Sequence, residues 1–108
     1  MKKMKNDILV LITQTALQTV PKGGKAILYG SRARGDSHDG SDWDLLILLN
    51  KSHLEPSDYD NVSFPFVMLG WENNQMINPI MYTLDEWKTY SDTPFYKNVL
   101  HDGIILTK

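Results

Sequence analysis

The first thirty residues combine apolar positions at helical spacing with a short continuous apolar run. Apolar residues recur at helical intervals across residues 4–19, which predicts an amphipathic helix. The segment PKGG at 21–24 follows directly, and because proline and glycine interrupt helices, the helix should end there. Residues 25–29 (KAILY) are short and mainly apolar, which predicts a strand that ends at Gly30.

The most hydrophobic stretch of the chain is WDLLILL at residues 43–49. Its length suits a strand, and its continuous apolar character is typical of a strand buried on both faces at the centre of a sheet. The polar residues 31–36 predict a turn that enters a brief helix, and residues 38–41 (HDGS) predict a loop.

The next segment predicts a helix followed by a third strand. Pro56 suits the start of a helix that runs to about Glu72, although Pro65 lies inside it and should weaken it. Residues 76–82 (MINPIMY) predict a strand. Because Pro79 has no N–H to donate, this strand should lie at an edge of the sheet or carry an interrupted ladder.

The C-terminal quarter predicts two short helices and a final strand. The segment TLDE that begins at Thr83 has capping-box spacing, so a helix should start there and continue to about Tyr90. A last helix is expected over residues 95–102 with Gly103 as its stop, and residues 104–106 can add a strand. The predicted fold is α+β, an α/β sandwich with a small mixed sheet of about three to four strands flanked by helices.

The size of the chain limits what it can contain. It has 108 residues, of which 42% are hydrophobic and 22% charged. These values are typical of a globular protein, and the length fits a single domain over residues 1–108. Such a domain can bury one modest core and present one cleft, so a separate acceptor-binding domain is not expected within it.

Charge and cysteine content narrow the classes of partner and site. The net charge of −2 argues against strong nonspecific binding of nucleic acid, which usually needs a basic surface. The chain has no cysteine, which excludes disulfides, thiolate nucleophiles and zinc–cysteine sites. Its apolar runs are shorter than the roughly 20 residues of a membrane span. A cytoplasmic protein without a membrane partner is therefore expected.

Two acidic residues stand at the start of the most apolar segment. Asp42 and Asp44 are two positions apart, so strand alternation places both side chains on one face, about 7 Å apart along the chain. Buried without a partner, each carboxylate would lower stability or stay protonated. A divalent cation removes this penalty, and oxygen ligands favour Mg²⁺ or Mn²⁺ over zinc. The pair is the predicted metal site and catalytic centre.

A predicted nucleotide site precedes the acids in the chain. Gly30 allows the backbone to approach a ligand closely, and Ser31 adds a hydroxyl and an N–H at the next turn. Arg32 and Arg34 add positive charge within reach of a polyphosphate. An anion-binding turn beside a metal-binding carboxylate pair is what phosphoryl or nucleotidyl transfer requires.

These residues resemble a known family. Gly30-Ser31 is followed after an eleven-residue step by Asp42, and Asp42-Trp43-Asp44 leads into apolar residues. The string GSRARG followed by SDWDLL resembles the minimal nucleotidyltransferase branch of the DNA polymerase beta-like nucleotidyltransferase superfamily. The resemblance implies a nucleotidyltransferase fold, metal binding by the two acids and binding of nucleotide phosphates by the Gly-Ser turn.

The resemblance also implies a third carboxylate on a neighbouring strand, which supports one metal ion and helps to deprotonate the attacking hydroxyl. The predicted strand at 76–82 offers Asn78 there, and Glu72 and Asp85 lie outside this strand. An amide can ligate a metal weakly but cannot act as a base. The domain therefore works slowly, takes its base from elsewhere, or has lost catalysis while keeping binding.

Three functions stay open at this point. The first is an enzyme that transfers a nucleoside monophosphate, AMP from ATP, to a hydroxyl group with Mg²⁺ or Mn²⁺ and releases pyrophosphate. The second follows from the resemblance, because the minimal branch is often paired with a small helical protein of the HEPN type, as the antitoxin of a toxin–antitoxin pair. The third is a nucleotide-binding subunit of a larger transferase, which the small size favours.

Several of these residues also allow interpretations that involve no nucleotide transfer. The segment GSRARGDS nearly fits a P-loop, but Asp36 stands in place of the lysine and would repel phosphate. Arg32 and Arg34 could instead be surface charges that pair with Asp36 or Asp39. His38 precedes the acids and is interpreted as a surface residue.

Overall fold

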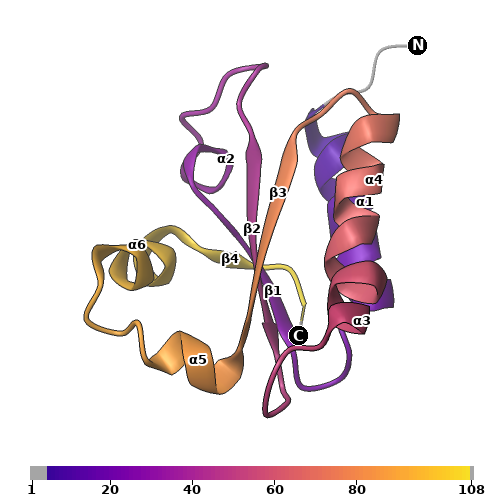
Figure 1. Ribbon diagram of the computed structural model, residues 1–108. Coiled ribbons are helices and arrows are strands. Elements are labelled where there is room, and N and C mark those ends of the chain that lie inside the picture. Colours follow the sequence, from indigo (N-terminus) through magenta and orange to yellow (C-terminus); the bar gives the residue numbers. More distant parts are fainter. Residues whose placement is uncertain (1–4, 108) are drawn as a thin grey trace.

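The computed structural model describes residues 5–107, with side chains from residue 7 onward. A four-stranded sheet lies between two groups of helices (Figure 1). In chain order the elements are α1 (Lys5–Thr19), β1 (Lys25–Tyr29), α2 (Ser31–Arg34), β2 (Trp43–Leu49), α3 (Pro56–Asp58), η1 (Tyr59–Ser63), α4 (Phe64–Glu72), β3 (Ile77–Thr83), α5 (Leu84–Lys88), α6 (Pro94–Asp102) and β4 (Ile104–Ile105). This arrangement confirms the predicted α+β class with a small mixed sheet.

The strand order is β3-β2-β1-β4, which makes β2 an interior strand. β2 pairs in parallel with β3 and antiparallel with β1, and β1 pairs antiparallel with β4. Every residue of β2 is buried except Asp44, which is half-buried, so the predicted central strand is confirmed. Pro79 lies in β3 at the edge of the sheet, where a missing N–H is tolerated.

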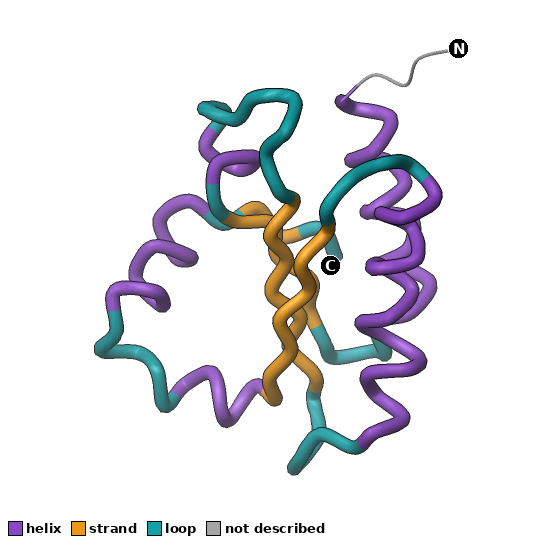
Figure 2. The backbone as a smooth tube through the Cα atoms, turned by 45° about the horizontal axis from the view of Figure 1, so that its top comes forward, coloured by secondary structure: helices purple, strands orange, loops and turns teal. Residues whose placement is uncertain are grey.

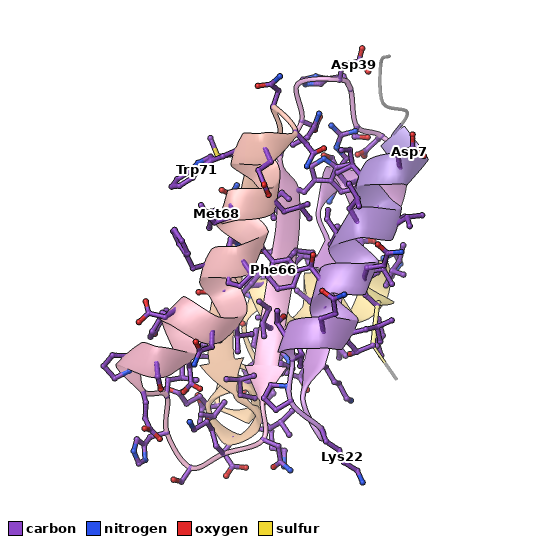
Figure 3. All side chains as sticks on the ribbon, turned by 90° about the vertical axis from the view of Figure 1, so that its right-hand side faces the viewer. Asp7, Lys22, Asp39, Phe66, Met68 and Trp71 are labelled. Carbon is purple, nitrogen blue, oxygen red and sulfur yellow. The ribbon has the colours of Figure 1, made fainter. Side chains whose placement is uncertain are left out.

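One face of the sheet is covered by α1 and α4. Ile12 of α1 and Phe66 of α4 are fully buried with Leu45 of β2 in one apolar core. Figure 3 shows Phe66 between α4 and α1, whereas the exposed Met68 and Trp71 project from the opposite side of α4, away from α1. Burial of each large apolar side chain contributes about 1.5–3 kcal/mol.

The opposite face packs against α5 and α6. Leu46 and Leu48 of β2 form a second core there with Trp87 of α5 and Val99 of α6. Because strand side chains alternate, Asp44 lies on this same face. Figure 2 shows that the loops before β2 and β3 lie at the same end of the sheet, as two parallel neighbours require. The open end of this face is where the acids lie.

The helix predicted from Pro56 to about Glu72 forms in three parts. A short α3 leads into the π-helical turn η1 at Tyr59–Ser63, and α4 begins at Phe64. Pro65 is in the first turn of α4, where its missing N–H is not needed. A proline within one continuous helix would clash with the carbonyl four residues earlier, so the wider turn precedes it.

The capping box predicted at Thr83 forms at the start of α5. Thr83 Oγ1 accepts from the Glu86 N–H at 3.0 Å, and Glu86 Oε1 accepts from the Thr83 N–H at 2.9 Å, which confirms the predicted capping box. α5 ends at Lys88, earlier than the predicted Tyr90, and β4 is shorter than predicted. Within residues 5–107, no helix combines the length and apolar character needed to cross a membrane.

Candidate active site

Asp42 and Asp44 lie where the chain enters β2. Asp42 is exposed and Asp44 is half-buried. The Asn78 side-chain N–H group donates to Asp42 Oδ2 at 3.1 Å and to Asp44 Oδ1 at 3.4 Å. Because one amide nitrogen contacts both carboxylates, the two acidic side chains converge on one point.

Asn78 reaches the acids because β3 runs parallel beside β2. The register pairs Asp44 with Asn78, and paired residues on neighbouring strands direct their side chains to the same face. The structure thus brings an amide to the place where the family resemblance implies a third carboxylate. Among residues 5–107, no group of three or more His, Cys, Asp or Glu side chains is arranged to hold a metal ion.

Gly30 lies against Asp44, at the turn between the end of β1 and the start of α2. Its φ is 77°, a left-handed value that favours glycine. A Cβ at this position would lie 2.7 Å from Asp44 Oδ2. The Gly-Ser turn therefore lies directly beside the Asp44 carboxylate, while the close approach of Gly30 to a ligand stays a prediction.

Ser31 opens the short helix α2 beside this turn. The Gly30 carbonyl accepts hydrogen bonds from the Ala33 and Arg34 N–H groups, each at 3.0 Å. The first N–H groups of a helix have no acceptor within it, and they can serve an anion. α2 has only four residues, so its dipole is weak. An anion at this turn would therefore be bound by the N–H groups at the first positions of α2 and by the Ser31 hydroxyl.

Arg32 turns its guanidinium toward the loop that precedes β2. Its Nε and Nη2 both donate to the Ser41 carbonyl, at 3.3 and 2.9 Å, and Nη2 also donates to the Asp39 carbonyl at 3.3 Å. The guanidinium carbon lies 4.4 Å from the centre of the Trp43 ring. The side chain predicted to bind nucleotide thus makes its contacts with the protein itself.

Arg34 forms surface ion pairs, one of the alternatives considered from the sequence. Its Nε donates to Asp36 Oδ2 at 3.1 Å, and Nη1 lies 3.7 Å from Asp102 Oδ2 at the end of α6. The hydrogen bond and the charge of Asp36 raise the pKa of Arg34 above its ordinary value. The charge of Arg34 is partly balanced by these acids.

The family assignment rests on nearly the whole chain. Residues 12–108 match the family model described as "Polymerase beta, Nucleotidyltransferase". The chain belongs to this nucleotidyltransferase family. No curated protein sequence matches it.

Two solved structures share the fold of this nucleotidyltransferase. One is a toxin–antitoxin crystal structure with AMP-PNP, with a TM-score of 0.60 and 16% identity over 95% of this chain and 73% of that chain. Another is a mutant of the toxin–antitoxin MntA-HpeT with two Asp-to-Glu substitutions, with a TM-score of 0.59 and 15% identity over 90% of this chain and 70% of that chain. At these identities the likeness shows the fold.

The donor set of this nucleotidyltransferase fits a divalent cation. Asp42 and Asp44 present converging carboxylates, and Asn78 can present its Oδ1 when the amide turns by half a rotation. All of these donors are oxygens, which suit Mg²⁺ or Mn²⁺. The family as a whole works with divalent metals, and these three side chains could hold one.

Tyr29 adds a neutral group beside the acids. It lies opposite Asp44 in the β1–β2 ladder, and its ring packs edge-on against Phe95 of α6 at 5.4 Å. Burial raises the pKa of Tyr29 to about 12, and the charge of Asp44 and the proximity of Tyr82 add to the shift. The phenol therefore stays protonated at neutral pH. No role was predicted for Tyr29 from the sequence, although it directly precedes Gly30 and could have been expected to lie near the site.

His38 belongs to the loop and is exposed, as interpreted from the sequence. Its ring Nδ1 accepts from the Gly40 N–H at 3.1 Å, and its backbone N–H donates to Ser41 Oγ at 2.9 Å. These contacts shape the loop that carries Asp42 toward β2.

Proposed function

We propose that this nucleotidyltransferase transfers AMP from ATP to a hydroxyl acceptor in the cytoplasm, with Mg²⁺ or Mn²⁺, and releases pyrophosphate. The observation that carries the proposal is the convergence of Asp42 and Asp44 beside the glycine turn. The Asn78 amide contacts both carboxylates, and the space for a Cβ on Gly30 is taken by Asp44. This geometry supports a cation site and an anion site that lie next to each other at this end of the sheet.

Asp42 and Asp44 hold the cation in this proposal. When bound, a divalent cation neutralises the phosphates and stabilises charge that develops on the leaving group. Asp42, just before β2, and Asp44, within it, supply the matching negative charge.

Gly30 and Ser31 hold the phosphates in this proposal. The positive φ of Gly30 lets backbone N–H groups come close to a phosphate, and Ser31 adds its hydroxyl. Arg32 and Arg34 supply positive charge beside the turn, which attracts a polyphosphate over a distance. Neither guanidinium needs to leave its protein partners for this attraction.

The reaction forms a bond between the acceptor oxygen and the α-phosphorus and breaks the bond from that phosphorus to the bridging oxygen. Pyrophosphate leaves with the electron pair of the broken bond. The acceptor proton passes to water, because Asn78 stands where a carboxylate base is expected. General base catalysis typically contributes about 10²–10⁴-fold, so a slow enzyme is expected.

Transfer is tested with ATP labelled at the α-phosphate, Mg²⁺ and candidate protein and RNA acceptors. We expect label on an acceptor and equal release of pyrophosphate, both lost in Asp42→Asn and Asp44→Asn. Asp39→Asn is the matched control, because it removes the same charge from an exposed loop position. Transfer that survives in both active-site variants would refute the proposed role of the acids.

A second proposed function is that of a protein partner. The two structural neighbours are described as toxin–antitoxin assemblies, which supports pairing with a small helical protein of the HEPN type. Asn78 also supports it, because a domain without the third carboxylate can retain binding while it loses catalysis. Coexpression with a neighbouring helical protein tests this function. A tight complex unchanged by Asp44→Asn, together with no transfer to any acceptor, would favour it over catalysis.

A further inference from the structure

We infer that Arg32 is a positioning residue that holds the loop before Asp42 in place, and that it does not bind the nucleotide phosphates directly. The inference rests on the proposed function, because the position of Asp42 matters for cation binding. In this inference, Arg32 connects the Gly-Ser turn to the loop that carries Asp42.

The first observation is how the guanidinium uses its donors. Nε and Nη2 both reach the Ser41 carbonyl, Nη2 also reaches the Asp39 carbonyl, and Nη1 lies 3.5 Å from Ser37 Oγ. All three nitrogens thus face residues of one loop. These contacts occupy four of the five guanidinium N–H donors, so a phosphate could reach only one Nη1 N–H without displacing a contact.

The second observation is the ring beneath the guanidinium. Arg32 stacks on Trp43 at 4.4 Å, and a cation over an aromatic face is held electrostatically. Trp43 is only 4% exposed, and its Nε1 donates to Gln75 Oε1 at 3.0 Å. The ring is therefore fixed in the fold, and it fixes the guanidinium in turn.

These contacts enclose the first acid of the site. Ser41 directly precedes Asp42 and Trp43 directly follows it, so Arg32 contacts the residue on each side of this acid. Asp42 itself is exposed and outside β2, so the sheet ladder alone does not fix it. Arg32 follows Ser31 in α2, so its contacts connect the Gly-Ser turn to the residues on both sides of Asp42.

Arg34 provides a matched control. It lies in the same short helix and carries the same charge, but its partners are Asp36 and Asp102. Arg34→Gln removes a positive charge near the turn without removing a contact to Ser41 or Trp43.

The test is Mn²⁺ binding without nucleotide, followed by electron paramagnetic resonance, on wild type, Arg32→Gln, Arg32→Lys and Arg34→Gln. Loss of a residue that orients a metal ligand typically weakens binding about 10–100-fold. We expect a loss of about tenfold or more in both Arg32 variants, because lysine keeps the charge but lacks the planar fork. Arg34→Gln should bind Mn²⁺ within about twofold of wild type, because its proposed role is to attract the nucleotide phosphates, which this assay does not contain.

A second readout separates this inference from the proposed function. Hydrogen exchange at the amides of His38, Gly40 and Ser41 reports the loop directly, since all three donate hydrogen bonds within it. We expect faster exchange in both Arg32 variants and no change in Arg34→Gln, with thermal unfolding as the check of folding. If wild type binds no Mn²⁺ but exchange responds, the proposed function fails while Arg32 still holds the loop.

Normal Mn²⁺ binding and normal exchange in Arg32→Gln, with a loss of ATP affinity alone, would overturn the inference. That result would make Arg32 a phosphate ligand.

Discussion

Gly30 combines a positive φ with a close approach to an acidic side chain. A Cβ there would meet Asp44 Oδ2 at 2.7 Å, which displaces a carboxylate of the proposed cation site. We predict that Gly30→Ala lowers the free energy of unfolding by about 1–3 kcal/mol and abolishes Mg²⁺-dependent ATP binding. Chemical denaturation and calorimetry measure the two effects.

Gly35 provides the control for this substitution. Its φ of 86° is equally unfavourable for alanine, but a Cβ there meets nothing within 4 Å. Gly35→Ala should cost about 1–2 kcal/mol of stability through the backbone alone and leave ATP binding intact. Equal loss of binding in both variants would show that backbone strain, rather than the contact with Asp44, is responsible.

Asn78 places a neutral amide, and not a third carboxylate, beside Asp42 and Asp44. Asn78→Asp places a third carboxylate at the contacts that the amide now makes with Asp42 and Asp44. We predict lower stability without a divalent cation, because like charges converge, and recovery on addition of Mn²⁺. Transfer should rise by about tenfold or more, because a base becomes available.

Thermal unfolding with and without Mn²⁺, and the transfer assay, measure the effects of Asn78→Asp. Asn98→Asp on the exposed side of α6 adds the same charge away from the site and should change neither. A variant at Asn78 that behaves like the one at Asn98 would contradict the assigned position of the amide.

At the scale of elements, the limits of β1 and β2 were predicted more accurately than the course of the long helix before β3. β1 and β2 have the predicted limits because continuous apolar runs bounded by polar turns leave little freedom in where a strand begins. The helix before β3 was predicted as one piece and contains a π-helical turn, because the effect of Pro65 depends on how the surrounding turn packs.

The start of α3 carries a pH-sensitive cluster. Asp58 Oδ2 accepts from Lys51 Nζ at 2.9 Å and from the Glu55 N–H at 2.8 Å. The hydrogen bond from Lys51, and then that from the Glu55 backbone, lower the pKa of Asp58 below its ordinary value of 3.8. A lowered pKa in the folded state stabilises the protein above the unfolded value, and this stabilisation is lost as the pH falls through the folded value.

We predict that Asp58→Asn lowers the melting temperature at neutral pH and that the difference from wild type shrinks as the pH falls below about 3.8. Melting curves across this pH range measure the difference. Asp60→Asn removes the same charge from an exposed position of the next turn and controls for the change in net charge. A constant deficit of Asp58→Asn at all pH values would contradict the role assigned to its charge.

At the scale of the whole molecule, the site is assembled from segments far apart in the chain. The order of the strands brings Gly30, just after β1, next to Asp44 on β2 and Asn78 on β3. Gly30 and Asp44 were predicted as site residues from local spacing, and Asn78 was identified only as the amide at the place where the resemblance implies a third carboxylate. Their roles in catalysis and binding stay predictions, as does the single domain over residues 1–108.

The contacts of Arg32 could not be predicted in the same way. They depend on how the loop between α2 and β2 folds back, and loop conformation is not fixed by a hydrophobic pattern. Only the charge of Arg32 was visible in the sequence, and the charge alone is compatible with a phosphate, an acid or a carbonyl as partner.

The most direct test of the account is calorimetric titration of ATP into wild type and Asp44→Asn, with Mg²⁺ and with a chelator. The account predicts that wild type binds ATP with Mg²⁺ and that affinity falls by about tenfold or more in the chelator or in Asp44→Asn. ATP bound with equal affinity by both proteins under both conditions, or by neither, would contradict a cation site formed by the acid pair beside Gly30.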